Sequence, residues 1–441
     1  MAVERPVGVG LIGLGTIGTG VVKVLQRNAE RIRDRLGFPL RLLRIADLDL
    51  DRDRGVDLSG IRFDADAEGL IRDPDVEVVV ELVGGTGAAR RLSLAAIGAG
   101  KPLVTANKAL LALHGAEIFG AAARRGVDVA FEASVGGGIP VLRALREGLC
   151  ANEILSVAGI MNGTTNYVLC EMERTGEDFE VVLKRAQELG FAEADPTFDV
   201  EGIDAAHKLT LLVAMAFGIR LATKEIPTEG IREIAPVDLA VARELGYAVK
   251  LLGIARQHAA GGGVEARVHP TLVPADSLLA SVDGAMNAIA ITGDAVGPTL
   301  YYGAGAGELP TASAVVADLM EVARGLRADC SVRVPPLGWP EPALADGSPR
   351  PLGELETRYY LRFSAVDRPG VLARISTALG DEGISIESVI QKARAASGGA
   401  VPVIMLTHRA REARVRAALQ RLEELAELTA PTRLVRIEEE F

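Results

Sequence analysis

Apolar positions in the first 145 residues occur in short runs that are separated by longer amphipathic stretches. Apolar runs that alternate with helical patterns are typical of βαβ units and a parallel sheet. We predict strands at Val7–Leu14, Leu40–Ala46, Val76–Leu82, Pro102–Thr105 and Val127–Glu132, with helical stretches at Gly18–Leu36 and Ser93–Ala99. The pattern therefore predicts an α/β protein with a Rossmann-type parallel sheet domain over residues 1–150.

From about Ile154 the strand-like and helical patterns no longer alternate regularly. The strand-like runs are Ile154–Ile160 and Glu265–Val273, and the helical patterns are Phe179–Gly190, Ile203–Phe217 and Ala314–Ala328. We therefore predict a second, mixed α/β domain over residues 151–333, and we expect part of residues 305–333 to complete the first domain.

A proline-rich stretch over residues 334–354 has the composition of a linker. The remaining residues, 355–441, follow the order of a compact βαββαβ unit. Its predicted elements are a strand at Arg358–Ala365, a turn and helix at Asp367–Glu382, strands at Ile384–Ala393 and Ala400–Thr407, a helix at Glu412–Leu425 and a strand at Thr432–Ile437.

Composition and charge narrow the class of protein. The chain has 441 residues and a formal net charge of −11, which argues against a nucleic-acid binder because backbone phosphates need a basic face. No run of about 18 apolar residues lacks charges or glycines, so we expect no membrane span. The start of the chain shows no secretory pattern, and three widely spaced cysteines suit reduced thiols better than disulfides or zinc. We therefore expect a cytoplasmic protein.

The first predicted strand leads directly into a glycine motif, Gly13-x-Gly15-x-x-Gly18, that opens a helix. In this context the first glycine permits a tight turn, the second lets the backbone approach a pyrophosphate, and the third allows close packing of helix on strand. The free N–H groups of the helix N-terminus then face the phosphates. The motif predicts a dinucleotide cofactor.

Asp47 ends the second predicted strand and is placed to accept a hydrogen bond from a ribose 2′-hydroxyl, which favours NAD. It lies 29 residues past Gly18, a spacing that we attribute to an extended first helix. Asp49 and Asp51 would repel the 2′-phosphate of NADP, whereas Arg44 and Arg52 are able to compensate. A solvated loop carboxylate is the alternative interpretation of Asp47.

Two further loops follow predicted strands at the sheet edge where ligands bind. Thr105 and Lys108 lie in one, and Lys108 is within reach of a ribose or substrate group unless it is simply a loop lysine in water. The other, Glu132–Pro140, contains three consecutive glycines. Such a loop is suited either to ligate a hard monovalent cation or to let the chain cross into the next domain.

The segment Gly190–Lys208 contains five carboxylates and no basic residue before its last position except His207. Asp204 and Lys208 share a helix face at i, i+4, and the apolar residues that follow predict that this helix is buried. The carboxylates are suited to hold a substrate ammonium group, and Lys208 is suited to donate a proton to a carbonyl oxygen as hydride arrives. A surface ion pair beside an acidic loop is the alternative. Only eight of the 48 basic residues are lysines, so Lys108 and Lys208 stand out.

With these motifs in hand, the whole chain resembles the homoserine dehydrogenases of the long, bacterial type. The segments that carry the resemblance are Gly10–Gly20, Val104–Lys108, Glu132–Pro140, Ile160–Asn166, Gly190–Lys208 and Gly303–Ala312. The last 80 or so residues resemble an ACT domain, with Asp367–Ala373 as its marker and Gly383–Ile386 following.

The resemblance implies a role for each matching residue. Lys208 would be the catalytic proton donor, with Lys108 and Asp199 close to the reaction centre, and Glu193 and Asp204 would grip the amino-acid end of homoserine. Asn162 and Thr164 would belong to a substrate loop. The implied cofactor contacts are Gly13, Gly15, Thr16, Ile17, Gly18, Asp47, Thr105, Lys108, Gly190 and Gly307. Glu132 with the carbonyl groups of Val135, Gly137 and Ile139 would form a sodium site.

The resemblance also implies the reaction, the reversible NAD(P)-dependent interconversion of L-homoserine and L-aspartate 4-semialdehyde. The middle domain would be catalytic and would form a homodimer or homotetramer, and the ACT domain would bind threonine as an effector. Many relatives carry a basic residue before the Asp47 position, and Ala46 here leaves the choice between NAD and NADP open. The alternatives are another ACT-linked dehydrogenase of amino-acid metabolism and a non-catalytic amino-acid sensor.

Overall fold

The computed structural model describes residues 5–258, 263–391 and 400–441, which form two compact units. The first unit contains the described residues up to Val157 together with His207–Glu225 and Asn287–Ser348. The second contains Ala158–Ala206, Ile226–Met286 and Pro349–Phe441. The chain therefore passes between the units several times.

The first unit is built on a parallel sheet with the strand order β3-β2-β1-β4-β5-β6. Every residue of β1 and of β4 is buried, as expected for central strands covered on both faces. The strands are β1 (Val7–Ile12), β2 (Leu40–Ala46), β3 (Arg62–Asp64), β4 (Val78–Glu81), β5 (Leu103–Thr105) and β6 (Val129–Ala130). This sheet confirms the predicted Rossmann-type fold.

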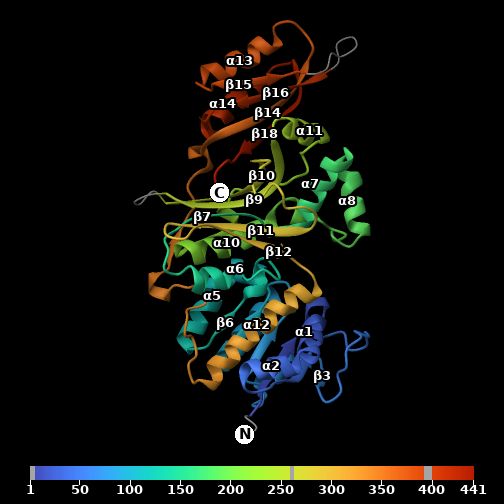
Figure 1. Cartoon of the computed structure of the whole chain (residues 1–441), viewed down its shortest axis with the longest axis vertical. Helices are drawn as coiled ribbons and strands as arrows, with labels where there is room; N and C mark the ends of the chain where they lie inside the picture. The colour runs from blue at the N-terminus through green and yellow to red at the C-terminus, as the bar shows by residue number, and fades with distance from the viewer. Residues whose placement is uncertain (1–4, 259–262, 392–399) are drawn as a thin grey trace. The chain divides into compact units, whose positions relative to one another are not determined.

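Helices cover this sheet, and the last of them comes from far along the chain. Figure 1 shows α12 (Glu308–Arg327), in orange, beside α1 (Thr16–Arg27), in blue. Val315 and Leu319 of α12 belong to the same buried apolar cluster as Val9 of β1. The others are α2 (Ala29–Leu36), α3 (Ala67–Arg72), α4 (Gly87–Gly98), α5 (Lys108–Arg125) and α6 (Val141–Arg143), which leads into a π-helical turn.

Two predicted elements of this unit are wrong in detail. The single helix predicted over Gly18–Leu36 is two helices that meet at Asn28, a residue type that favours helix ends over helix interiors. The strand predicted over Val127–Glu132 keeps only the two residues of β6. A 3₁₀ turn follows at Glu132–Ser134, where the Glu132 N–H donates to the carboxylate of Asp318 on α12.

The proline-rich stretch predicted as a linker has structure of its own. Ala345–Gly347 forms β13, which pairs in parallel with β8 (Ile219–Leu221). Trp339 donates its indole N–H to the carbonyl oxygen of Met215 at 2.8 Å. In the same unit, β11 (Met286–Gly293) and β12 (Gly297–Ala304) are neighbouring strands.

The second unit contains a sheet with the strand order β9-β10-β18-β14-β16-β15. The antiparallel pair β9 and β10 joins the ACT-like segment because β18 lies parallel to β10 at Thr271–Arg436 and Leu272–Ile437. The ACT-like elements occur in the predicted βαββαβ order around one apolar core, with the short β17 added. Of the predicted strand Ile384–Ala393, β15 covers Ile386–Ile390, and residues 392 and 393 lie outside the described residues.

The remaining bounds in this unit are as follows. Its strands are β9 (Tyr247–Gln257), β10 (Val264–Pro274), β14 (Glu356–Val366), β16 (Ala400–Thr407), β17 (Ala410–Arg411) and β18 (Leu428–Ile437). Its helices are α7 (Gly163–Thr175), α8 (Phe179–Glu188), α9 (Thr197–Val200), α11 (Pro236–Glu244), α13 (Val371–Asp381) and α14 (Glu412–Glu423). The chain crosses the boundary between units within β7 (Ile154–Ile160) and α10 (Ile203–Phe217).

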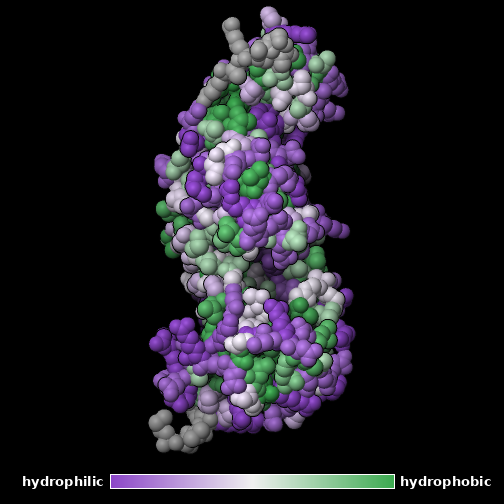
Figure 2. All heavy atoms as spheres, turned by 90° about the vertical axis from the view of Figure 1, so that its right-hand side faces the viewer, coloured by the Kyte–Doolittle hydropathy of each residue, from purple (hydrophilic) through white to green (hydrophobic). Residues whose placement is uncertain are grey.

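The face drawn in Figure 2 is mostly hydrophilic, with smaller apolar groups between the polar residues. Among the described residues, none of the helices has the length and apolar character needed to cross a membrane.

Candidate active site

The glycine motif forms the turn between β1 and α1. Gly13 has φ +97°, and a Cβ there would lie 2.6 Å from the carbonyl oxygen of Leu82. A Cβ on Gly18 would lie 2.1 Å from the carbonyl oxygen of Gly13, so the helix is packed tightly on the turn. Gly15 faces open space, because a Cβ added there would have no described neighbour within 4 Å. The exposed backbone of Gly15 and Thr16 at the start of α1 is thus accessible to an anion.

Asp47 is tied to this turn. Its carboxylate accepts hydrogen bonds from the backbone N–H of Leu14 and, at 2.9 Å, of Asp49. Arg54, whose side chain is 5% exposed, lies 3.5 Å from the Asp47 carboxylate and donates to the carbonyl oxygen of Leu14 at 2.7 Å. Asp47 is therefore a structured part of the turn, which weakens the interpretation of a solvated loop carboxylate.

A pocket of about 580 Å³ opens beside the turn. Gly13, Gly15 and Asp47 line it, together with Asp66, Glu68 and Arg91. The charged side chains at the rim of this pocket are mostly acidic. Arg91, the arginine among them, already forms an ion pair with Glu68. This pocket has the size and position for the adenosine end of a dinucleotide.

Thr105 lies at the end of β5 and is fully buried. Its hydroxyl donates to Glu81 at 2.8 Å and accepts from the backbone N–H of Asn107 at 3.0 Å. Asn107 caps α5, so Lys108 is the first residue of that helix and is half-buried. Burial raises the pKa of Glu81. Sequence reasoning missed Glu81, although a carboxylate at the end of a buried strand was a signal that could have revealed it.

Glu132 forms the core of the predicted cation loop. Its two carboxylate oxygens accept the backbone N–H groups of Leu142 at 2.9 Å and Arg143 at 2.8 Å. Burial, and after it the nearby Asp318, raise the pKa of Glu132 to about 7. Burial also raises the pKa of Asp318 to about 6. Asp318, 186 residues away along the chain, was not predicted and carried no local signal.

The second unit brings three of the predicted substrate residues together. The side-chain amide of Asn162 donates to Asp199 at 2.7 Å and to Asp204 at 2.9 Å. The Asn162 side-chain oxygen accepts the Thr165 N–H at 2.9 Å and so caps α7. Because Asp204 is 2% exposed, this amide fixes a buried carboxylate.

Other predicted residues lie on the rim of this group. Thr164 donates its hydroxyl to the carbonyl oxygen of Phe191 at 2.6 Å, which connects α7 to the segment after α8. Gly190 has φ +78° and ends α8. Glu193 is exposed, and no described residue bonds its carboxylate. The structure thus leaves the Glu193 side chain facing solvent.

Helix α10 carries Asp204 and, one turn later, Lys208, which is 6% exposed. Both residues are buried, as the apolar residues after Lys208 predict. The alternative of a surface ion pair is therefore wrong. A buried lysine is suited to proton transfer because its charge depends on its surroundings. Gly307, by contrast, lies at the exposed start of α12 with φ +122°.

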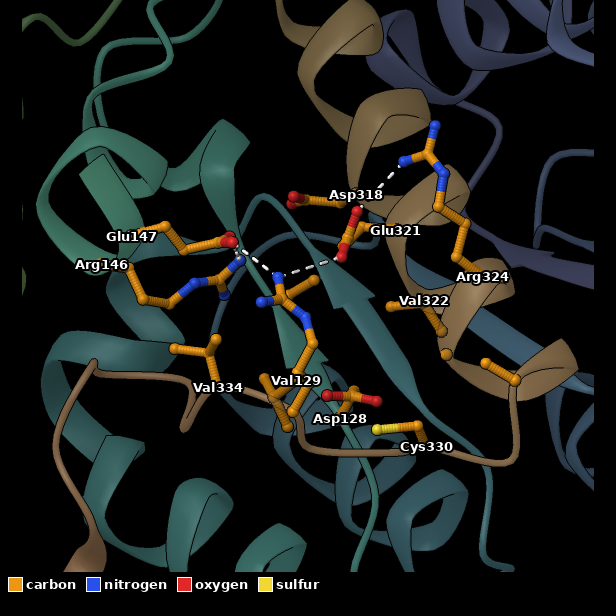
Figure 3. Close-up of a pocket in the computed structure, with 14 residues that line it drawn as sticks. Asp128, Val129, Arg146, Glu147, Asp318, Glu321, Val322, Arg324, Cys330 and Val334 are labelled. Atoms are coloured by element: carbon orange, nitrogen blue, oxygen red, sulfur yellow. Dashed lines mark hydrogen bonds and ion pairs between the residues drawn. The ribbon is translucent and has the colours of Figure 1, made fainter. Parts of the chain in front are cut away.

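A different pocket, of about 310 Å³, lies beside Asp318 and contains none of the predicted site residues. Figure 3 shows the charged side chains of Asp318, Glu321 and Arg324 on α12, of Arg146 and Glu147 on the π-helical turn, and of Asp128 just before β6. Arg333 pairs with Glu147 at 2.6 Å and with Glu321 at 3.5 Å, and Arg324 pairs with Glu321 at 3.0 Å. These ion pairs account for the charges of Glu147, Glu321, Arg324 and Arg333.

The glycine turn, the carboxylate of Asp47 beside it and the buried lysine of α10 are features of a dinucleotide-dependent oxidoreductase, here with an ACT-like segment. Residues 13–132 match the family model of the homoserine dehydrogenase NAD binding domain, and residues 140–320 match that of homoserine dehydrogenase. Residues 359–427 match the ACT domain. The chain belongs to the homoserine dehydrogenase family.

Individual relatives agree with this assignment. A homoserine dehydrogenase of Pseudomonas aeruginosa is 50% identical over 435 residues, which cover 99% of both chains. The crystal structure of a homoserine dehydrogenase from Thiobacillus denitrificans is 51% identical with a TM-score of 0.92, again over 99% of both chains. A hyperthermophilic archaeal homoserine dehydrogenase in complex with NADPH is 25% identical with a TM-score of 0.61, covering 72% of this chain and 98% of that chain. The family is one of NAD(P)-dependent oxidoreductases, and the chain's membership in it favours homoserine dehydrogenase over both alternatives considered from the sequence.

Proposed function

We propose that this chain interconverts L-homoserine and L-aspartate 4-semialdehyde with Lys208 as its proton-transfer residue. The observation that carries the proposal is the arrangement on α10, where a buried Lys208 follows by one turn a buried Asp204 that is fixed by Asn162. One helix therefore presents both a group for the substrate's charged end and a group for its reacting oxygen.

The chemistry requires a proton at the same oxygen whose carbon exchanges hydride. A bound NAD(P) supplies or accepts that hydride. In the reducing direction the Lys208 ammonium donates a proton to the aldehyde oxygen, and in the oxidising direction neutral Lys208 accepts the proton of the homoserine hydroxyl. Lys108, at the start of α5, adds positive charge that stabilises the developing alkoxide, and Asp199 lies near the reaction centre.

The substrate's amino-acid end is held by carboxylates. Asp204 and Glu193 bind its ammonium group, and Asn162 keeps Asp204 in place. Thr164 orders the loop through its bond to Phe191. The exposure of Glu193 is consistent with a residue that engages only when substrate is present.

We further propose NAD as the preferred cofactor, bound by the glycine turn and Asp47, with contacts from Thr16, Ile17, Thr105, Lys108, Gly190 and Gly307. The acidic rim of the 580 Å³ pocket disfavours the 2′-phosphate of NADP. A spectrophotometric assay with homoserine and each cofactor tests this choice. A kcat/KM that is higher with NADP than with NAD contradicts it.

The loop after Glu132 has a donor set that fits a sodium ion. Val135 and Gly137 are buried, and no described backbone N–H bonds to their carbonyl oxygens. Ile139 and Glu132 supply further oxygens, although these already accept backbone N–H groups. Oxygen donors alone suit a hard cation, and burial of a carboxylate is less costly beside one.

The ACT-like segment is the place for regulation. We propose that Asp367–Gly370, which precedes α13, lines a site for threonine, and that the enzyme is a homodimer or homotetramer. We also propose that the enzyme is cytoplasmic. Activity measured with and without millimolar threonine tests the regulation, and the mass from light scattering tests the oligomeric state. If threonine changes neither activity nor mass, regulation by threonine is contradicted.

A further inference from the structure

A cluster of buried charges lies where the last ACT-like strand joins β10. Arg436 of β18 is fully buried and donates to Glu229 at 3.0 and 2.9 Å and to Glu412 at 3.0 and 2.7 Å. Arg416 of α14 donates to Glu229 at 2.8 Å and to Glu412 at 2.9 Å. Glu229 lies outside the ACT-like segment, so two arginines of that segment hold a carboxylate of the substrate domain.

The charges in this cluster are mutually dependent. The side chains of Arg436 and Glu412 are 0% and 2% exposed, and that of Glu229 is 31% exposed. Burial acts to raise the pKa of Glu229, but the Arg436 and Arg416 guanidinium groups outweigh it and hold the pKa below its usual value. Removing one partner from such a group leaves a buried charge without its counterpart.

The backbone next to Glu229 contacts both β10 and the acidic segment Gly190–Lys208. The N–H of Glu229 donates to the carbonyl oxygen of Val268 on β10 at 2.8 Å, and the N–H of Ile231 donates to the carbonyl oxygen of Val200 at 2.9 Å. A Cβ on Gly230 would lie 2.4 Å from that same Val200 oxygen. No side chain separates the two stretches of backbone at this point, so a shift of residues 229–231 is passed on to Val200.

Val200 in turn is adjacent to the residues that contact Asn162. Asp199 precedes it, and Asp204 follows it after a tight turn at Gly202, which has φ +79°. A Cβ on Gly202 would lie 3.1 Å from the methyl carbon of Thr228. The segment that carries Asp199 and Asp204 thus rests on the residues around Glu229 at two separate points.

We propose that Glu229 is a positioning residue for the substrate site. The arginines Arg416 and Arg436 fix Glu229, and Glu229 fixes the backbone of residues 199–204, so that the two carboxylates next to Asn162 keep their place. Glu229 touches neither substrate nor cofactor and acts through that backbone. The inference rests on the proposed role of Asp204 in binding the substrate's amino-acid end and on the proposed place of Asp199 near the reaction centre.

The test compares five variants of the full-length protein: three single variants at Arg416, Glu229 and Arg421, the double variant Arg416→Gln with Glu229→Gln, and Asp204→Asn. Arg416 is 49% exposed, so Arg416→Gln removes one bond to Glu229 with little risk to folding. Glu229→Gln removes the charge itself. Arg421→Gln is the matched control, because Arg421 lies on the same helix, is 58% exposed and pairs with Glu382.

For Arg416→Gln and Glu229→Gln we expect the KM for homoserine to rise about threefold to tenfold, as for mutations in other packed networks. The KM for NAD and the kcat are expected to stay within about twofold, since cofactor contacts and Lys208 are untouched. The double variant is expected to raise the homoserine KM by less than the product of the two single effects, because Arg416 and Glu229 belong to one network that also includes Glu412. Arg421→Gln is expected to leave all constants unchanged.

Two results overturn the inference. One is an unchanged homoserine KM in the folded Arg416→Gln and Glu229→Gln proteins. The other is an equal rise in Arg421→Gln, which shows a general loosening of the ACT-like segment. Asp204→Asn separates this failure from failure of the proposed substrate site. If Asp204→Asn leaves the homoserine KM unchanged, the substrate site is wrong, and if only the Glu229 variants have no effect, the positioning role alone is wrong.

Discussion

The glycine turn and the charge cluster around Glu229 are built in opposite ways. The turn uses the consecutive residues Gly13–Gly18, and its binding groups are backbone N–H groups that any sequence with the right glycines would present. The cluster uses Glu229, Glu412 and Arg436, of which the first and last are 207 residues apart. One region is therefore specified locally, and the other exists only after the ACT-like segment has docked on β10.

The two regions also differ in their exposure to solvent and in the consequence of that exposure. Gly15 is exposed, so that a ligand can reach the backbone. Arg436 is fully buried, so that its charge is neutralised by Glu229 and Glu412 rather than by water. A local motif exposes chemistry to a ligand, whereas a long-range cluster excludes water and holds the backbone.

We expect the largest effect at Lys208, because it is the proposed proton-transfer residue. Lys208 also depends on both local sequence and tertiary packing. Its place on α10 follows from local pattern, and its burial follows from tertiary packing. We expect Lys208→Ala to lower kcat by about 10²- to 10⁴-fold, the usual range for general acid–base residues, while NAD binding is retained. Steady-state kinetics and a fluorescence titration of NAD measure the two quantities. Turnover near that of the unchanged enzyme would remove Lys208 from the mechanism.

Two glycines of the turn are expected to affect different quantities: Gly18 the free energy of unfolding, and Gly15 the affinity for NAD. We expect Gly18→Ala to lower the free energy of unfolding by about 1–3 kcal/mol or more, because its Cβ would meet the Gly13 oxygen. Gly15→Ala is expected to keep the stability within about 0.5 kcal/mol, because the site is open. Under the proposed binding of the cofactor, its Cβ takes space that the pyrophosphate would use, so the Kd for NAD should rise.

Urea unfolding and NAD titration of both glycine variants form a matched pair. The comparison fails if Gly15→Ala loses as much stability as Gly18→Ala, or if it binds NAD as tightly as the unchanged protein.

Asp47 tests whether a side chain contributes to the otherwise backbone-built cofactor site. We expect Asp47→Ala to raise the KM for NAD about tenfold, through loss of a charged hydrogen bond, and to raise the KM for NADP less. Asp53→Ala is the control, because Asp53 is exposed on the same loop and has no proposed cofactor role. Equal losses with the two cofactors would show that Asp47 only supports the turn through Leu14.

The smallest expected effect is the pH dependence of the charge cluster. The pKa of Glu229 is held below its usual value of 4.5, so its ion pairs stabilise the fold fully above about pH 4.5. That stabilisation is lost as the pH falls through the folded-state pKa. Glu229→Gln should therefore be less stable than the unchanged protein by about 1–2 kcal/mol at pH 7, and this difference should shrink in acid. A stability difference that does not change between neutral pH and acid below the folded-state pKa would indicate a packing effect.

Much of the candidate site was accessible from the sequence because it depends on short spacings. The i, i+4 spacing of Asp204 and Lys208 and the apolar run behind them predicted a buried pair, and both residues are buried. Asn162 was predicted from resemblance alone, and its bonds to Asp199 and Asp204 depend on a strand and two helices meeting. Asp318 and Glu229 were missed, since each gains its partners from residues far along the chain. Glu81 was missed although its place at the end of a buried strand was a signal.

The amino-acid sequence by itself determined the family, the parallel-sheet domain, the glycine turn and the βαββαβ tail, because these depend on periodicity and on residues close together in the chain. The prediction was wrong at Asn28, where one helix ends and the next begins, and in the proline-rich stretch, where β13 pairs with the distant strand β8. Only the tertiary structure decided that β18 pairs with β10 and that Arg436 reaches Glu229. The physical reason is that the burial and pairing of a charge depend on which distant elements pack against it. The spacing of residues along the chain does not determine that packing.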